Sequence, residues 1–297
     1  MPQKTSGYDS LAFVILNYCS EKDTKKCVSQ LLSFGKDYHI IVVDNMSPDD
    51  SYINLLNHFS ESEQVDVIQS SSNDGYATGN NFGIHFAKGK YGIRTIGIMN
   101  PDVFIPNVGV IDDLVALLWS DEECIYVGGR PINSADPKTS MPAFWNIPDS
   151  IGVVRNTSLL TKWTDAQHQS HCLRISDDVY KVECVTGCFF LAKYKLLSEI
   201  NFFDEGTFLY NEENILALRA QKAGYYGLVN NEVSYYHNHS SVEEKQSLSS
   251  KLNATKPFFL SRKYLINTYY SKLLLPFLYI SEGINKAVLF FSFLKNR

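Results

Sequence analysis

Five amide and carboxylate side chains directly follow short apolar runs, and their types suit the binding of a nucleotide held partly through a metal ion. They are Asn17 after residues 11–16, Asp44 and Asn45 after residues 40–43, and Asn100 and Asp102 after residues 96–99. Short runs of this kind, rich in β-branched residues, are typical of buried parallel strands. Ligands of open α/β sheets bind just beyond the carboxyl ends of the strands, so we expect these side chains to share one crevice.

Asp44 has two interpretations. An aspartate at a strand end can accept a hydrogen bond from the ring N–H of a pyrimidine. Asp44 also precedes Ser47-Pro48, which predicts the start of a helix, and an Asx group often caps such a start. The residue types leave both interpretations open.

Asp102 belongs to an Asn-Pro-Asp sequence that suits a divalent cation. A carboxylate held by proline at the end of a buried strand can bind a hard cation that bridges two phosphates. The same three residues also make good turn sequence. Because one carboxylate is a small ligand set, we expect a further ligand, and His237, with His239 as its substitute, follows another predicted strand.

Glu212 and Glu213 begin a predicted helix that runs to Ala223 and stops at Gly224. A carboxylate in this position can take the proton from an attacking hydroxyl as a general base. Acidic residues are also common in the first helical turn, because they interact favourably with the helix dipole. Both interpretations stay open.

Gly75, Gly79 and Gly83 are spaced four residues apart, which on a helix makes a stripe of small residues. Such a stripe serves either the close packing of a helix on a sheet or the approach of backbone to a ligand. In the second case Asn73 and Asn80 supply polar contacts. The spacing differs from GxGxxG, so a dinucleotide fingerprint is excluded.

Apolar runs alternate with helical patterns over the first hundred residues. The predicted strands cover residues 11–16, 40–43, 65–68 and 91–99, with helical patterns at 21–32, from 47 onward and around 73–83. This alternation predicts an α/β fold with a doubly wound, mostly parallel sheet.

The later part of the chain contains fewer regular patterns. We expect a helix at 111–119, strands at 125–128 and 233–236, a helix at 211–223, and a strand at 182–192 interrupted by Thr186-Gly187. Residues 131–182 show little periodicity, which indicates a long excursion over one face. Excursions of this length in compact domains are often functional.

Residues 242–297 are predicted to form a linker and a C-terminal helical extension, with the polar linker over residues 240–255. From Pro257 onward the chain has six basic residues against one acidic residue, although its net charge is -5. Two apolar segments, 273–280 and 287–294, are each far shorter than the roughly 20 residues that span a bilayer. A helix lying in the membrane interface and a helical pair packed on the preceding domain fit this pattern equally well.

Composition excludes several classes of protein. Hydrophobic residues make up 44% of the chain, which is typical of a globular protein, and the net charge of -5 argues against a nucleic-acid partner. The six cysteines form no CxxC pair, and the first ten residues lack the apolar region of a signal peptide. We therefore expect a cytoplasmic protein that binds no nucleic acid, with peripheral contact to the inner face of the plasma membrane left open.

Taken together, seven segments resemble the family-2 type of inverting glycosyltransferase with the GT-A fold, particularly its rhamnosyltransferase-like branch. They are VILNY (14–18), VVDNMS (42–47), NDGYATGNNFG (73–83), NPDV (100–103), TGCFFLAK (186–193), FFDEGTFLYNEENILALRAQKAGY (202–225) and the V-x-x-x-H-x-x-x-S element (233–241). Their order and spacing match over residues 10–241, which is more specific than any one motif. The resemblance predicts a GT-A domain over 1–241, with 131–182 on the acceptor side.

The resemblance also implies a role for each matching residue. The nucleotide sugar would be bound by Asn17, Asp44, Asn45, Asn73, Gly75, Asn80, Asn100 and Asp102. Asp102 would hold Mg²⁺ or Mn²⁺ together with His237, and Gly187 would line the acceptor side. Glu213, or failing it Glu212, would be the general base. The implied reaction moves one sugar from dTDP-rhamnose or a UDP-sugar to a hydroxyl of a lipid-linked oligosaccharide or polysaccharide intermediate.

Three departures from the family pattern keep a second function open. The metal motif has one carboxylate where many relatives have two, Met46 replaces a small or polar residue, and Ile215 stands where many relatives have Asp. A catalytically silent module that binds a nucleotide sugar or glycan in an assembly complex would fit these changes. A sugar-phosphate nucleotidyltransferase is disfavoured, because residues 17–21 lack the Gly-rich basic loop that such enzymes need.

Overall fold

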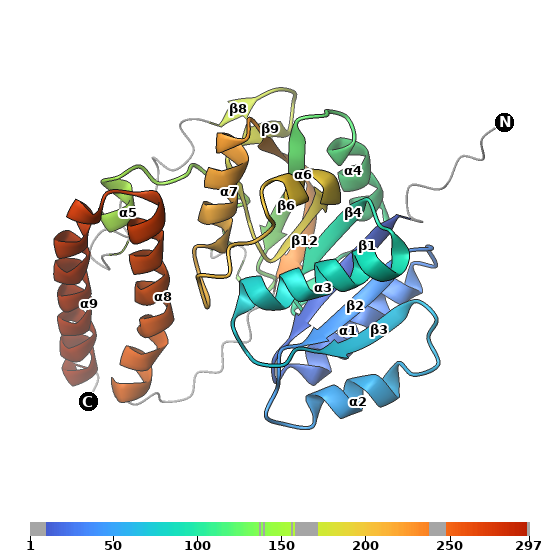
Figure 1. Cartoon of the computed structure of the whole chain (residues 1–297), viewed down its shortest axis with the longest axis horizontal. Coiled ribbons are helices and arrows are strands. Elements are labelled where there is room, and N and C mark those ends of the chain that lie inside the picture. The colour runs from blue at the N-terminus through green and yellow to red at the C-terminus, as the bar shows by residue number, and fades with distance from the viewer. Residues whose placement is uncertain are drawn as a thin grey trace.

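A mixed ten-stranded sheet with helices on both faces forms the centre of the computed structural model (Figure 1). The structure describes residues 10–136, 138, 140–155, 157, 172–237 and 248–295. Strand order in the sheet is β3-β2-β1-β4-β11-β6-β12-β9-β8, with β5 paired to β12. The α/β fold with a mostly parallel first half agrees with the expectation from the sequence.

The first half of the sheet is built from four parallel strands joined through helices. These elements are β1 (Leu11–Asn17), α1 (Glu21–Ser33), β2 (His39–Asp44), α2 (Ser51–His58), β3 (Val65–Gln69), α3 (Tyr76–Tyr91) and β4 (Thr95–Met99). In the parallel register Asn17 pairs with Asp44 at the ends of β1 and β2. The carboxyl ends of these strands therefore meet at one edge of the sheet, as predicted.

The second half of the sheet is mixed. The elements of this part of the chain are β5 (Val103–Phe104), α4 (Gly109–Leu118), β6 (Cys124–Ile132), β7 (Phe144–Trp145), α5 (Gly152–Arg155), β8 (Leu173–Arg174), β9 (Val179–Val182), β10 (Cys184–Val185), β11 (Phe189–Lys193), α6 (Tyr194–Glu199), α7 (Glu212–Lys222) and β12 (Tyr226–His237). Strands β7 and β10 pair with each other in a separate two-stranded sheet. Strand β11 runs antiparallel to both β4 and β6, whereas β12 is parallel to β6. The ends of β12 and β4 are brought close by β5, since His237 pairs with Val103.

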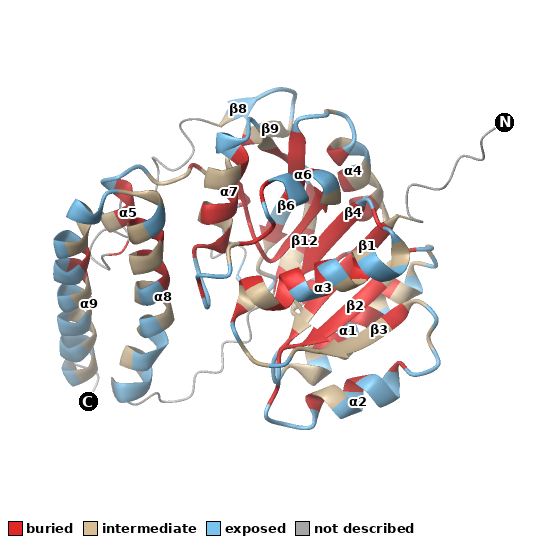
Figure 2. Cartoon of the chain, in the orientation of Figure 1, coloured by how far each residue is buried: buried red, intermediate tan, exposed pale blue. Residues whose placement is uncertain are grey.

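Alternate residues of the strands supply two separate cores, one on each face of the sheet (Figure 2). Phe13 and Ile15 pack with α1, α2 and α4, while Ala12 and Val14 pack with α3, α6 and α7. Helix α3 lies unusually close to the sheet, because a Cβ atom at Gly83 would come within 2.6 Å of a Val14 methyl. At Gly83 the glycine stripe thus serves helix–sheet packing.

Two predicted strands differ from the observed ones in their bounds. The run at 91–99 becomes a strand only from Thr95, because α3 continues to Tyr91 and ends at Gly92 with φ of 64°. The run at 182–192 divides into β9, β10 and β11, with the predicted break at Thr186-Gly187 between the last two. Apolar content predicted both regions, but helix capping and sheet pairing set their ends.

The C-terminal residues form a helical hairpin beside the sheet domain (Figure 1). It consists of α8 (Leu248–Tyr269), a short 3-10 turn η4 (Lys272–Leu274) and α9 (Leu275–Lys295). The expected linker at 240–255 is wrong for residues 248–255, which belong to α8 although Pro257 follows inside the same helix. Residues 238–247 lie outside the described part of the chain.

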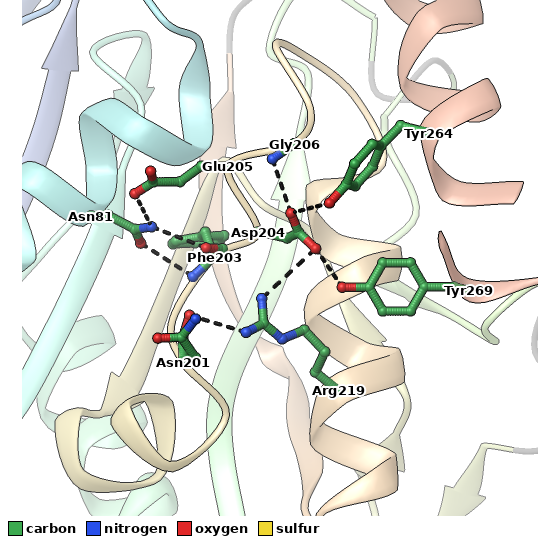
Figure 3. A network of polar contacts seen from close by, with 9 residues as sticks. All are labelled: Asn81, Asn201, Phe203, Asp204, Glu205, Gly206, Arg219, Tyr264 and Tyr269. Carbon is green, nitrogen blue, oxygen red and sulfur yellow. Dashed lines mark hydrogen bonds and ion pairs between the residues drawn. The ribbon is translucent and has the colours of Figure 1, made fainter. Parts of the chain in front are cut away.

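Helix α8 is joined to the sheet domain by the carboxylate of Asp204 (Figure 3). This carboxylate accepts hydrogen bonds from the Tyr264 hydroxyl at 2.8 Å, from the Tyr269 hydroxyl and from the Gly206 amide at 2.9 Å. It also lies 4.0 Å from the guanidinium of Arg219 on α7. Helices α7 and α8 and the loop between α6 and α7 therefore share one polar anchor.

Candidate functional site

The ends of β1 and β2 are joined by a buried polar network around Asp44. Asn17 donates from Nδ2 to Asp44 Oδ2 at 2.8 Å, and both residues are fully buried. Asp44 Oδ1 accepts from the Ser47 amide and from Gln69 Nε2, each at 3.0 Å. The Ser47 contact is an Asx turn of the kind that the sequence allowed. The two predicted nucleotide-binding residues are thus brought together, with their polar atoms bonded to each other and to neighbouring loops.

Asn45 connects the next two loops of the same edge. Its Nδ2 donates to Asn73 Oδ1 at 2.9 Å and to the Gly75 carbonyl at 3.2 Å, while its Oδ1 accepts from Ser70 Oγ at 3.1 Å. Gly75 has φ of 103° and lies against the backbone of Phe208, so a side chain there would clash. The structure therefore brings Asn45, Asn73 and Gly75 together, and it also brings the loop before α7 to them.

Asn80 lies on α3 and is buried. Its Nδ2 donates to the Tyr76 carbonyl one helical turn earlier at 2.9 Å. The side chain therefore supports the first turn of α3 beside the loop that holds Asn73.

Asp102 and His237 meet at the edge formed by β4, β5 and β12. His237 Nε2 lies 3.3 Å from Asp102 Oδ1, and the histidine is 4% exposed whereas the aspartate is 27% exposed. Burial disfavours the charged imidazole, but the hydrogen bond to Asp102 and the neighbouring Cys188 outweigh it and raise the pKa of His237 to about 10. Residues separated by 135 positions in the chain thus form the pair that was predicted as a metal ligand set.

This pair has the donor chemistry that a divalent cation needs. One carboxylate oxygen and one imidazole nitrogen suit Mn²⁺, provided the imidazole is neutral when it ligates. Among the described residues no group of three or more His, Cys, Asp or Glu side chains is placed to hold a metal. Asp102 and His237 therefore fit a cation whose remaining ligands come from a substrate and water. His239, the predicted substitute, lies outside the described residues.

Glu212 and Glu213 begin α7 and occupy different environments. Glu212 is 5% exposed, and its Oε1 has no hydrogen-bond partner within the part of the chain that the structure describes. Burial and the neighbouring Glu213 raise the pKa of Glu212 to about 8. Glu213 is partly exposed, and burial of its carboxylate raises its pKa as well. Both carboxyl groups are therefore set to hold a proton more tightly than a glutamate in water.

Gly187 is the residue against which the Glu213 carboxylate lies. A Cβ atom at Gly187 would overlap Glu213 Oε1, and the Gly187 amide donates a hydrogen bond to this carboxylate. The predicted acceptor-side residue and one of the two predicted bases are thus in direct contact.

Tyr76 is a member of the site that the residue types did not reveal. Its hydroxyl lies 2.9 Å from the Gly187 carbonyl oxygen and 3.3 Å from Asn100 Oδ1. Its pKa is raised by burial and by the nearby carboxylates of Glu213 and Glu212. Tyr76 therefore bridges the glutamate side of the site and the strand end that leads to Asp102. Its position inside the NDGYATGNNFG segment was the only signal.

Strained backbone lies at several places around the site, among them Cys19 with φ of 52°. Tyr210 and Asn211 have φ of 75° and 71° directly before Glu212, and Met46 has φ of 58° directly after the Asp44-Asn45 pair. Left-handed backbone at residues other than glycine is uncommon and concentrates at functional positions. Met46, a departure from the family pattern, is 49% exposed, so its side chain contributes little to the core.

Known proteins that resemble this chain identify its family. A model of glycosyl transferase family 2 matches residues 12–199 of the chain. The chain belongs to this family. The matching model describes family 2 as a whole. The rhamnosyltransferase-like branch therefore stays a prediction.

One curated relative of this family-2 chain is the low-salt glycan biosynthesis hexosyltransferase Agl10 of Haloferax volcanii. The two are 27% identical over 222 residues, which cover 72% of this chain and 62% of the relative. The chain therefore spans less than two thirds of the length of this relative.

Two solved structures share the GT-A fold of the chain. The mannosyltransferase PcManGT from Pyrobaculum calidifontis, in complex with GDP-Man and Mn²⁺, superposes with a TM-score of 0.56 at 11% identity over 94% of this chain and 73% of that one. GalNAc-T7 with UDP, GalNAc and Mn²⁺ gives 0.58 at 13% identity over 83% of this chain and 47% of that one. At these identities the likeness establishes the fold.

Proposed function

We propose that the chain is an inverting glycosyltransferase that moves one hexose from a nucleotide-diphosphate donor to a hydroxyl group of a lipid-linked oligosaccharide or polysaccharide intermediate. Family membership supports the reaction class. The hexosyltransferase relative supports a hexose and a role in glycan biosynthesis. We propose dTDP-rhamnose or a UDP-sugar as the donor.

The observation that carries this proposal is the connected path from Glu213 to Asp102. The Glu213 carboxylate contacts Gly187, whose carbonyl oxygen bonds the Tyr76 hydroxyl, which in turn approaches Asn100, two residues before Asp102. A candidate base and a candidate diphosphate site are thus connected through the hydroxyl of a single tyrosine. An inverting transfer needs both groups in one site, since the acceptor hydroxyl must approach the sugar from the side opposite the leaving phosphate.

The donor side of the site is organised by the strand ends. Asn17 and Asp44 hold the loops after β1 and β2 in the form that would receive the base, and Asn45, Asn73 and Gly75 hold the loop that would line the sugar. Asp102 and His237 would hold Mg²⁺ or Mn²⁺ at the diphosphate. When bound, the cation would neutralise charge that develops on the departing nucleoside diphosphate.

The acceptor side supplies the base. Glu213 is the partly exposed member of the pair, and its raised pKa makes it a better proton acceptor than an ordinary carboxylate once it is ionised. In the proposed step the Glu213 carboxylate removes the proton from the acceptor hydroxyl, whose oxygen attacks the anomeric carbon. The bond to the diphosphate breaks and the configuration inverts. Burial and the neighbouring Glu213 raise the pKa of Glu212 to about 8, so Glu212 tends to stay protonated beside the proposed base.

Calorimetric titration with dTDP, UDP, GDP and CDP, each with and without Mn²⁺, tests the donor side. We expect metal-dependent binding of one diphosphate by the wild-type protein and its loss in Asp102→Ala. Binding that ignores both Mn²⁺ and Asp102 would remove the metal from the mechanism. Release of free sugar from the matching nucleotide sugar then tests for catalysis.

A specific observation keeps the silent binding module as the second candidate. Ile215, at the place of an acid in many relatives, is fully buried and packs against α8, so this position supplies no carboxylate. A silent module would bind a diphosphate but would neither hydrolyse nor transfer the sugar. The unpaired cysteines of the chain suit a reducing compartment, and we place either function on the cytoplasmic side.

A further inference from the structure

Helix α9 is exposed over much of its surface (Figure 2), and its exposed side carries an apolar stripe. Its large members are between 36% and 82% exposed and recur every three, four or seven residues: Leu273, which precedes the helix, and Phe277, Ile280, Ile284, Phe291 and Leu294. We call these six residues the α9 stripe. Together with the turn before it, the helix is long and apolar enough to cross a membrane. Only 11% of its most apolar segment is buried.

The inner side of α9 is more polar than the α9 stripe. Ser281 is buried there, and Asn285 donates from Nδ2 to the Thr157 carbonyl at 2.6 Å. Leu278 is the one fully buried large side chain of the helix within the described residues. Leu275 and Leu278 do pack on an apolar cluster with α8, but in a soluble protein the longer apolar stripe of a surface helix normally faces the core. We therefore expect the α9 stripe to contact an apolar partner outside the molecule.

The rest of the structure indicates that α9 lies along a surface rather than across a membrane. Helix α9 packs on α8, with the Phe259 and Tyr279 rings 5.6 Å apart, and on α5, and Asn285 bonds Thr157, which follows α5. Helix α8 is itself anchored to the catalytic domain through Asp204. Insertion of α9 across a bilayer would break these contacts and bury polar groups of the inner side in lipid. Contact through the stripe alone preserves all of them.

Charge around the α9 stripe favours an anionic surface. Lys272 lies exposed beside Leu273. Lys286 lies exposed midway along α9 and forms an ion pair with Glu282 at 2.7 Å, so its charge is partly balanced within the helix. Lys263 on α8 stacks over the Tyr279 ring at 5.7 Å. The last three residues of the chain add Lys295 and Arg297 to the sequence, and Glu282 is the single acidic residue after residue 256. Basic residues beside exposed apolar and aromatic side chains are the chemistry of a helix in an anionic membrane interface.

We propose that the α9 stripe docks in the interface of an anionic lipid bilayer, with α9 parallel to the membrane plane. Through α8 and Asp204 this contact would hold the loop that precedes Glu213 at a constant orientation to the membrane. The docking itself stands on the α9 stripe alone. Only the further step, that docking delivers a lipid-linked acceptor to the site, rests on the proposed function.

Cosedimentation with lipid vesicles tests the docking, without any sugar donor. We expect the full-length protein to bind vesicles of phosphatidylglycerol and phosphatidylcholine more tightly than vesicles of phosphatidylcholine alone, with binding that weakens as salt is raised. The triple variant Phe277→Glu, Ile280→Glu, Ile284→Glu should bind at least about tenfold more weakly. The matched control, Ile53→Glu with Leu56→Glu, changes residues of α2 that are 53% and 38% exposed and should bind like the wild type.

Two further measurements guard against a misfolded variant. Diphosphate binding by the triple variant should equal that of the wild type, which separates loss of docking from loss of the fold. In Phe291→Trp, a single conservative change, the added tryptophan emission should shift to shorter wavelength when anionic vesicles are added.

Three outcomes would overturn the proposal. Equal vesicle binding by the triple variant and the wild type would show that the α9 stripe is not the contact. A wild-type dimer in solution that the triple variant abolishes would assign the stripe to a second copy of the chain. Resistance of the bound protein to extraction at alkaline pH would indicate that α9 spans the bilayer. Docking with no sugar transfer would leave this inference standing and remove the proposed function.

Discussion

The two halves of the site differ in how fully their buried polar groups are hydrogen-bonded. At the ends of β1 and β2, Asn17 and Asp44 are fully buried and bonded to each other and to neighbouring loops. At the start of α7, Glu212 is almost as deeply buried, yet one of its oxygens has no partner among the described residues and its pKa is raised to about 8. Strained backbone at Tyr210 and Asn211 precedes it.

This difference indicates a division of labour between the halves. A buried group with all its hydrogen bonds made contributes to stability and holds a loop in one form. A buried carboxylate that lacks partners costs stability, and such groups concentrate where a proton must move. We therefore expect changes at the ends of β1 and β2 to act mainly on stability, and a change of the proposed base Glu213 at the start of α7 to act mainly on turnover.

The largest expected effect comes from Glu213→Gln. This change removes the proposed base while keeping its size and its contact with Gly187, so turnover should fall about 1,000-fold, within the range that general bases contribute. Diphosphate binding should stay unchanged in calorimetry. The matched change, Glu212→Gln, should retain most of the turnover; if the two variants exchange these results, the base is Glu212.

Asp102→Ala should have the second largest effect. Loss of the carboxylate that would hold the cation should weaken diphosphate binding in the presence of Mn²⁺ by about 100-fold, and chelation of the metal should do the same to the wild type. Asp113→Ala, at an exposed position on α4, provides the control. Wild-type binding that survives chelation would argue against the Asp102–His237 metal site.

Asn17→Ala tests the contribution of the fully hydrogen-bonded network at the ends of β1 and β2. It would leave Asp44 Oδ2 and Thr24 Oγ1 without the side chain that each contacts at 2.8 Å. The free energy of unfolding should fall by about 1–3 kcal/mol, the usual cost of an unsatisfied buried group. Urea denaturation measures this change, with Asn57→Ala on the exposed side of α2 as control. An unchanged midpoint would show that the network adds nothing to stability.

The last expected effect is a pH dependence of stability that Glu212→Gln removes. The pKa of Glu212 is about 8 in the folded protein and near 4.5 when unfolded, so the folded state binds the proton more tightly. Its contribution is full below the unfolded pKa and is lost as pH rises towards 8, with a slope of up to about 1.4 kcal/mol per pH unit.

Urea denaturation at pH 5, 6.5 and 8 measures this slope. The slope should be shallower in Glu212→Gln than in the wild type, while Glu232→Gln at an exposed position should leave it unchanged. Equal slopes in all three proteins would show that folding does not raise the pKa of Glu212.

The structure agrees with those expectations from the sequence that rested on patterns of a few neighbouring residues. The apolar runs before Asn17 and Asp44 form parallel strands, and the helix that begins at Glu212 ends at Lys222, one residue before the expected Ala223. The linker expected around residues 240–255 failed in part, because polar composition does not exclude a helix that packs on another element. Residues 248–255 belong to α8, whose later turns dock on Asp204 and on the core around Leu265.

The sequence by itself indicated the family through its resemblance over seven ordered segments. It also determined the order of the strands along the chain and the polar residues at their ends, because hydrophobic periodicity and turn chemistry act over a few residues. Only the tertiary structure decided which of those residues meet. The contact of Gly187 with Glu213, the bridge through Tyr76 and the pair of Asp102 with His237 each join distant parts of the chain. The exposure of the α9 stripe was decided in the same way, since a helix has an outer side only once its inner side has packed.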